Sequence, residues 1–447
     1  MPTPPPSYRQ LLRLAGPVVL AQMASAITGI VDTTVMGRFG SATDLAAVAV
    51  GAVVFNLVAW AFGFLRMATT GLTAQAMGAD DGPQAKAVLL RALGIGLVAG
   101  LAIAASLPFL GPLLQPVFGV APEVGSEAGS YLTARGLGAP AALMGFAING
   151  WLLGRGRTRQ LLVFQVVLNG TNAVLDTVFV AGLGMGAAGV GLGTALANVV
   201  ALGVGLWLVR EAFTAAAPVF DGPRLRALFG ANRDILIRTL ALVASFAWFV
   251  RAGAAHGTDV VAGNEVLLQF IAVSALVLDA FAFLTEKEAG EAVGASDPSR
   301  LLAVLRRTSV LSLGAGACFA LFIAGFGPSI VHVVVADPGA REAALRFLPY
   351  CALVPVIGVP AWQLDGLFLG ATRGPALRNA AVAATLAYVL VDRLVAPLGP
   401  HAMWWAFLAS YGFRAAGLGV ATPALLRELT RSEGPSHPRG TGSPPPA

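Results

Sequence analysis

Charged side chains are scarce in this sequence. Of its 447 residues, only 12% are Asp, Glu, Lys or Arg, whereas 56% are hydrophobic and the mean hydropathy is +0.76. Soluble domains carry about 25% charged residues, roughly twice this share, so the composition excludes a soluble protein. Glycine is abundant at 54 residues, and glycine is enriched in membrane helices because it lets neighbouring helices approach closely. The composition therefore predicts an all-α polytopic protein embedded in a lipid bilayer.

Residues that carry metal, redox or catalytic chemistry are equally few. The two cysteines, Cys318 and Cys351, lie in apolar surroundings and form no CxxC, so we interpret both as small core residues. The four histidines show no metal-ligand spacing, and no Walker A or GxSxG motif is present. We therefore expect neither an enzyme nor a bound cofactor. The net charge of +6 comes without a run of basic and aromatic residues, so we expect no nucleic-acid partner.

Apolar segments bounded by charge, glycine or proline predict twelve transmembrane helices of about 20 residues or more. We expect them near residues 11–36, 44–70, 87–111, 127–152, 159–182, 187–210, 232–255, 261–285, 303–332, 342–369, 376–397 and 401–426. The central connection divides the chain into an N-terminal six-helix lobe, a central cytoplasmic loop, a C-terminal six-helix lobe and a tail, at residues 1–210, 211–231, 232–429 and 430–447. The tail is rich in Pro, Gly and Ser and is expected to be disordered.

An internal repeat relates the two halves. GWLLGRGRT (150–158) aligns with GLFLGATRG (366–374), and the same offset of 216 residues aligns TAQAMGA (73–79) with AGEAVGA (289–295). Asp176 likewise falls on Asp392. Because an even number of spans returns the chain to its starting side, this repeat predicts two pseudo-symmetric lobes about an axis along the membrane normal, with a cavity between them.

Arginine placement predicts the orientation, because cytoplasmic segments carry an excess of Lys and Arg. One set of segments, which we assign to the cytoplasm, contains Arg9, Arg13, Lys86, Arg91, Arg155, Arg157, Arg159, Arg210, Arg224, Arg226, Arg233, Arg238, Arg300, Arg306, Arg307, Arg373, Arg378 and Arg427. The opposite segments contain Arg38, Arg135, Arg251, Arg341, Arg346 and Arg393. Both termini are therefore predicted to be cytoplasmic.

Polar side chains within the predicted N-terminal spans mark a candidate site. Asp32 lies near the end of the first apolar run, Asn172 and Asp176 share one helix face at i and i+4, and Thr194 falls in the next span, with Asn169 nearby. An ionised aspartate in hydrocarbon costs at least a few kcal/mol unless it is satisfied. An oxygen-rich pocket of this kind suits a hard monovalent cation or a proton shared by two aspartates. The alternative is that each group bonds helix backbone or lines a wet cavity, and for Thr194 alone we favour that structural role.

Four further charges lie in or near predicted spans and are secondary candidates. Arg66 sits deep in the second span and needs a carbonyl or carboxylate partner, for structural support or for function. The C-terminal half offers Asp279, Glu286 and Asp365. Asp365 either faces the cavity or caps a cytoplasmic turn.

Long motifs in the chain resemble the DinF-like branch of the multidrug and toxic compound extrusion (MATE) transporters. They are FGFLRMATTGLTAQAMGA, GWLLGRGRT, NRDILIRTLAL, LDAFAFLTE and VIGVPAWQLDGLFLGATRGPALRN, and the matches run in order from about residue 10 to 425. The resemblance implies twelve helices in two lobes and export of small organic, often cationic or amphipathic compounds, driven by protons or sodium. It places the family's cation-coupling site on Asp32, Asn172, Asp176 and Thr194, where a sodium ion is the one metal expected. It places two further family acids on Asp365 and Glu286, and a monomer suffices for this architecture.

The sequence departs from the family pattern at Lys287, Glu288 and Glu291 in TEKEAGEAVG, and at Glu265. Lys287 and Glu291 are i and i+4 and can pair, whereas Glu288 and Glu265 have no evident partner. These charges fall on the expected gating surface of the C-terminal lobe, so a non-transporting membrane scaffold is one alternative. A lipid-linked precursor flippase of the same superfamily is another, although such a flippase would favour a basic central cavity. We favour a cation-coupled antiporter.

Overall fold

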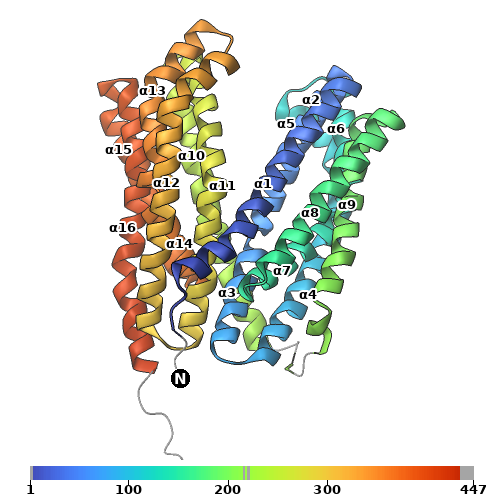
Figure 1. The fold of residues 1–447 in the computed structure, drawn as a ribbon. Helices are drawn as coiled ribbons and strands as arrows, with labels where there is room; N and C mark the ends of the chain where they lie inside the picture. Colours follow the sequence, from blue (N-terminus) through green and yellow to red (C-terminus); the bar gives the residue numbers. More distant parts are fainter. Residues whose placement is uncertain (1–3, 215–216, 219–221, 433–447) are drawn as a thin grey trace, which may run out of the picture.

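The computed structural model describes residues 4–214, 217–218 and 222–432, and every regular element in these ranges is a helix (Figure 1). In chain order they are α1 (Tyr8–Phe39), α2 (Ala42–Phe62), α3 (Phe64–Gly78), α4 (Gly82–Ser106), η1 (Leu107–Phe109), α5 (Gly111–Phe118), α6 (Pro122–Gly136), α7 (Ala139–Gly154), α8 (Thr158–Asp176), η2 (Thr177–Gly182), α9 (Gly186–Leu208), η3 (Arg210–Thr214), α10 (Gly222–Ala254), α11 (Thr258–Gly294), α12 (Pro298–Val334), α13 (Pro338–Ile357), α14 (Val359–Gly370), α15 (Gly374–Val395), η4 (Ala396–Leu398) and α16 (Pro400–Ser432).

Two helix bundles make up the molecule, as predicted. Figure 1 shows α1 to α9 in one bundle and α10 to α16 in the other, which we call the N-lobe and the C-lobe. The bundles meet at the lower end of the view and diverge towards the upper end. Helix α16 ends at the lower end, which we call the basal face, and α1 begins in the lower half of the view, so the first described helix begins and the last one ends towards the same side.

The helices are long enough to cross a bilayer. Within the described residues, ten are sufficiently long and apolar, and the α6–α7 pair, bent by 53°, adds an eleventh if it is one span. Helix α16 occupies the predicted twelfth span and has 33 residues, but it is not among these apolar helices. The span expected near 127–152 corresponds to this pair and is broken between Gly136 and Ala139.

Three helices extend beyond their predicted bounds. Helix α10 already begins at Gly222, inside the segment expected to be the central loop. Helices α11 and α12 each extend over 37 residues, well beyond the predicted spans 261–285 and 303–332. The predicted disordered tail falls largely on residues 433–447, which lie outside the described residues, as do 215–216 and 219–221 in the central loop.

The backbone follows the repeat register read from the sequence. Helices α4 and α12 begin at positions 216 residues apart, and each is capped by an aspartate, Asp81 or Asp297, that accepts from a backbone N–H. The residues before these caps, Asp80 and Ser296, both have positive φ, at 57° and 51°. A left-handed residue in the same place of each turn is uncommon for non-glycine residues, so the two halves share their local geometry.

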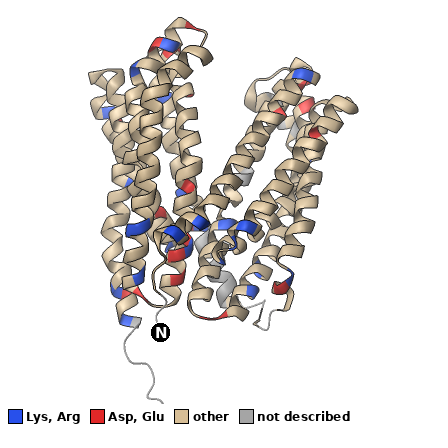
Figure 2. Ribbon diagram, viewed as in Figure 1, with Lys and Arg blue, Asp and Glu red and all other residues tan. Residues whose placement is uncertain are grey.

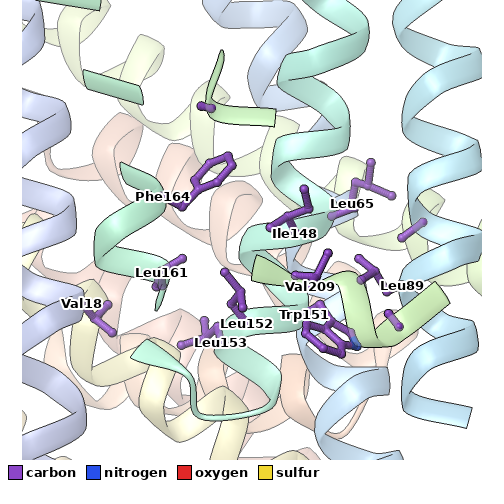
Figure 3. Close-up of a cluster of buried hydrophobic side chains, with 14 of the residues drawn as sticks. Val18, Leu65, Leu89, Ile148, Trp151, Leu152, Leu153, Leu161, Phe164 and Val209 are labelled. Carbon is purple, nitrogen blue, oxygen red and sulfur yellow. The ribbon is translucent and has the colours of Figure 1, made fainter. Parts of the chain in front are cut away.

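Each lobe has its own apolar core. In the N-lobe, Figure 3 shows the indole of Trp151 among aliphatic side chains from neighbouring helices. Trp151 is fully buried, and its N–H donates a 2.8 Å hydrogen bond to the carbonyl of Ala85, which satisfies the polar edge of the ring. In the C-lobe, Cys351 is buried as predicted, but Cys318 is exposed on α12, so its interpretation as a core residue is wrong.

The lobes contact each other at the basal end, where α3 packs against α11 and α14. Gly78 lies directly against the backbone of Glu291, and Gly294 lies directly against the backbone of Gln75. These contacts are related by the 216-residue repeat, so the pseudo-symmetry axis passes between them. A Cβ atom at either glycine would overlap a carbonyl group. Glycine is therefore required for the lobes to close here.

Candidate functional site

The carboxyl groups of Asp32 in α1 and Asp176 at the end of α8 lie within hydrogen-bonding reach of each other. Asp176 is completely buried. An ionised carboxylate only accepts hydrogen bonds, so a bond between two carboxyl groups holds a proton. The Oδ1 atoms of both aspartates find no N–H or O–H donor among the described residues. The pair therefore has unused acceptor capacity, and such a site is chemically able to hold a small cation.

Asn172 and Thr194 complete this cluster. The Asn172 amide nitrogen donates to Asp176 Oδ2 at 3.1 Å and to Thr194 Oγ1 at 3.1 Å, which puts the i and i+4 residues on one face as predicted. Thr194 in turn donates to the carbonyl of Val190 at 2.9 Å. The structure thus brings together all four residues that the sequence singled out in the N-lobe.

Local backbone geometry positions Asp176. A π-helical turn, η2, follows it directly, and such turns are frequent at functional sites because they reorient neighbouring side chains. Across from it, Gly193 of α9 leaves just enough room for the carboxyl group, since a Cβ at this position would collide with Asp176 Oδ1. The close approach of α9 depends on this glycine.

A cavity of about 670 Å³ opens beside the aspartates in the N-lobe. Asp32, Asn172 and Thr194 line it together with uncharged amides, and these amides are Asn56, Asn149, Gln165, Asn169 and Asn198. Asn169 donates a 3.3 Å hydrogen bond to Ser25, which links α8 to α1. Among the described residues that line this cavity Arg135 is the one cation, so the cavity beside the aspartates is not the basic one expected for a flippase.

Arg135 is the site residue that sequence reasoning missed. It lies in α6, donates a hydrogen bond to the hydroxyl of Tyr131 and places its guanidinium 4.1 Å from the ring centroid of Phe55. Its charge acts on both Asp32 and Asp176. The sequence showed it only as one charge of the non-cytoplasmic segments, because nothing local indicates that α6 turns it inwards.

The candidate acids of the C-lobe lie among arginines. Asp365 is 4% exposed and forms an ion pair with Arg238, and its Oδ2 is 3.6 Å from Nε of Arg414. It is therefore neutralised by two arginines and does not cap a turn. Asp279 is half-buried in the same charge network.

Glu286 and Arg66 connect the lobes. Arg66 Nη1 lies 3.5 Å from Glu286 Oε2, and the guanidinium stacks 4.1 Å from the ring centroid of Phe283. Glu286 is fully buried. The partner that Arg66 was expected to need is thus a carboxylate of the other lobe, at the level where α3 and α11 pack.

The charged residues that follow Glu286, at which the sequence departs from the family pattern, form ion pairs with one another and with Arg300. Lys287 lies 2.7 Å from Glu288 and 2.9 Å from Glu291, and Arg300 of α12 lies 3.3 Å and 2.7 Å from the same two acids. The expected Lys287–Glu291 pair is confirmed, but the expectation that Glu288 has no partner is wrong. Glu265, by contrast, is exposed and accepts from Gln269 at 3.2 Å. The cluster satisfies its own charges at the basal end of the C-lobe.

The repeat gives the N-lobe site a counterpart in the C-lobe. The positions 216 residues after Asp32 and Asp176 are Trp248 and Asp392. Trp248 Nε1 donates to Asp392 Oδ2 at 2.9 Å. One aspartate is therefore replaced by an indole, and the C-lobe lacks the pair of carboxyl groups at this position.

The chain is similar in sequence and in fold to known membrane transporters and their relatives. The MatE family model matches residues 17–178. The chain is 35% identical over 435 residues to DNA damage-inducible protein F of Escherichia coli (strain K12), covering 95% of this chain and 93% of that protein. It is 25% identical over 445 residues to a probable multidrug resistance protein NorM of Acinetobacter baylyi, covering 95% and 96%. Its fold is similar, with a TM-score of 0.84 and 19% identity over 95% of this chain and 96% of the other, to a structure described as the outward-facing conformation of a multidrug resistance MATE family transporter of the MOP superfamily.

Proposed function

This chain belongs to the MATE family of multidrug efflux transporters, and we propose that it is a proton-coupled antiporter of organic, often cationic or amphipathic, compounds. MATE proteins are integral membrane transporters and not enzymes. The arginine-rich basal face is then the cytoplasmic face of a bacterial inner membrane, with both termini on that side. The protein works as a monomer, because its two lobes are supplied by one chain.

The close approach of the Asp32 and Asp176 carboxyl groups, which can share a hydrogen bond, carries this proposal. A proton between the two carboxyl groups supplies the coupling ion directly. The Asn172 amide presents its N–H groups to the cluster, whereas a sodium ion requires oxygen ligands such as the amide carbonyl. This orientation favours the proton over sodium.

The transport cycle follows from neutralisation of the pair. A proton that enters from the open side binds between Asp32 and Asp176 and changes the packing of α1, which contains Pro17 and is a helix that can bend there. The changed α1 displaces substrate from the cavity. Release of the proton to the cytoplasm restores the negative charge, which attracts a new organic cation.

The cavity supports the substrate class. Its volume of about 670 Å³ falls within the range of about 300–1,000 Å³ that is common for drug-sized ligands. Its walls combine apolar side chains with uncharged amides, and Asp32 supplies the negative charge. Such a surface accepts many organic cations through weak contacts.

Transport in liposomes tests the proposal. Purified protein is reconstituted, a pH gradient or a sodium gradient is imposed, and movement of a fluorescent organic cation is followed. We expect flux with the pH gradient and none with sodium alone. Flux driven by sodium alone would replace the proton with sodium as the coupling ion. The absence of flux under both gradients would favour a non-transporting scaffold.

A further inference from the structure

A second large pocket lies at the basal face of the N-lobe, away from the aspartates. It encloses about 850 Å³ between the beginning of α1, the beginning of α8 and the end of α9. Four arginines line it, and they are Arg13, Arg157, Arg159 and Arg210. Figure 2 shows Lys and Arg gathered on the N-lobe and C-lobe helices near the level where the lobes meet.

Most of this positive charge is uncompensated. The pocket contains one acid, Glu211, which lies 2.8 Å from Arg157 and also pairs with Arg155. Burial raises the pKa of Glu211, but the hydrogen bond from Arg157 and the charges of both arginines outweigh burial and hold that pKa below its ordinary value. The acid is thus ionised and fully engaged. Arg13, Arg159 and Arg210 form no ion pair with any described residue.

Uncharged donors face the same pocket. Thr158, the first residue of α8, is 4% exposed and lines the pocket, and its hydroxyl has no hydrogen-bond partner among the described residues. The N-cap of α8, Arg157, provides no side-chain cap, so the first N–H groups of a 19-residue helix are left for an external acceptor. A helix N-terminus beside arginines favours a phosphate.

The surroundings place this pocket at the edge of the bilayer. Trp207 also lines it and is 62% exposed, and the guanidinium of Arg210 stacks 5.0 Å from its ring centroid. Tryptophan concentrates at the membrane–water interface. Leu12, next to Arg13 in α1, is 52% exposed, as a lipid-facing side chain would be.

We propose that this pocket binds the phosphate headgroup of an anionic phospholipid from the basal leaflet. The phosphate lies among Arg13, Arg159 and Arg210 and accepts from Thr158, while the acyl chains extend along the exposed surfaces of α1 and α9. Basic pockets between membrane helices are a recognised form of lipid headgroup site. The lipid joins the beginning of α1 to α8 and η3.

The position gives the bound lipid a role in the transport cycle. Arg13 precedes Pro17, the point at which α1 can bend, and Asp32 lies further along the same helix. A headgroup that fixes the first turns of α1 holds one end of the helix while the segment beyond Pro17 changes its packing. This role rests on the proposed function, whereas headgroup binding itself does not.

Native mass spectrometry of the full chain tests the site without any gradient or substrate. The protein is titrated with phosphatidylglycerol or phosphatidylcholine carrying identical acyl chains. We expect each protein molecule to retain one phosphatidylglycerol tightly and to bind phosphatidylcholine more weakly. The triple variant Arg13→Gln, Arg159→Gln, Arg210→Gln should bind phosphatidylglycerol about 100-fold more weakly, because each arginine near an anionic lipid contributes. The charge-matched variant Arg306→Gln, Arg427→Gln, Arg431→Gln, whose arginines are exposed in the C-lobe, should bind like the wild type.

Two further arms separate the alternatives. Thr158→Val removes one donor without changing charge and should weaken binding several-fold, which keeps the test valid if the triple variant does not fold. Inorganic phosphate should fail to displace the lipid. Equal retention of both lipids, unchanged binding by the triple variant, or efficient displacement by phosphate would overturn the proposal. Loss of transport with intact lipid binding would count against the proposed function alone.

Discussion

The indole N–H of Trp248 donates a 2.9 Å hydrogen bond to Asp392. The repeat places this pair where Asp32 and Asp176 meet in the other lobe. Asn172 is likewise replaced by Tyr388, and Thr194 by Ser410. At this position of the repeat, the scaffold therefore holds two carboxyl groups in the N-lobe and one, bonded to an indole, in the C-lobe. This asymmetry supports the proposal that proton exchange occurs in the N-lobe.

Asp32→Asn should abolish coupling. The amide keeps the shape of the side chain but cannot bind and release a proton, so pH-driven efflux in liposomes should fall to the level without a gradient. The matched variant Asp392→Asn changes the counterpart in the C-lobe and should retain pH-driven efflux. If Asp392→Asn lost coupling while Asp32→Asn kept it, the asymmetry argument would be wrong.

Gly193→Ala should impair the site without changing any ionisable group. The new methyl group would collide with Asp176 Oδ1, and overpacking of this kind typically costs about 1–3 kcal/mol. We expect slower pH-driven efflux and a changed pH dependence of the rate. Gly203→Ala, in the same helix with nothing within 4 Å, should transport normally. Equal rates for the two variants would show that close approach of α9 does not matter.

The basal contact between lobes should depend on its two glycines. In the double variant Gly78→Ala, Gly294→Ala, each methyl group meets a backbone carbonyl of the other lobe. If this overlap costs about 1–3 kcal/mol only while the lobes touch here, the population of the state with this contact falls roughly tenfold or more. Transport should fall, whereas Gly94→Ala, Gly314→Ala, with open space around both positions, should not affect it.

Thermal unfolding in detergent separates this effect from misfolding. The two double variants should unfold at similar temperatures if the lobes themselves are intact. A much lower unfolding temperature for the Gly78, Gly294 double variant would instead show that these glycines are needed for the fold itself.

Lys287→Met should destabilise the C-lobe by about 3–5 kcal/mol, because it leaves the acids Glu288 and Glu291 short of one cation in a buried place. The double variant Lys287→Met, Glu288→Gln removes the excess negative charge and should recover part of the loss. Denaturant unfolding measures both. No loss in the single variant would mean that Arg300 alone satisfies the cluster.

The sequence predicted what depends on local pattern. Asn172 and Asp176 were expected on one helix face because i and i+4 residues are neighbours, and they are hydrogen-bonded. The repeat offset likewise predicted equivalent helix starts. These features follow from spacing along one helix or from comparison of two segments.

Features that depend on tertiary contacts could not be predicted in this way. Glu288 finds Arg300 only because α12 turns back alongside α11. Arg135 shares the cavity with Asp32 because α6 packs against α2 and α9. Spacing carries no information about such pairings. The 53° bend after Gly136 is a different case, because Gly136, Gly138 and Pro140 in the first turn of α7 mark a break that the predicted span did not take into account.

Under the proposed function, Asp32 and Asp176 share one proton, and binding of an organic cation releases that proton. Calorimetric titration of an organic cation into purified protein, repeated in buffers of different ionisation enthalpy, counts the protons released on binding. The account predicts release of about one proton by the wild type, since the pair holds one, and none by Asp32→Asn. Equal release by both proteins, or none by a wild type that binds the cation, would contradict it.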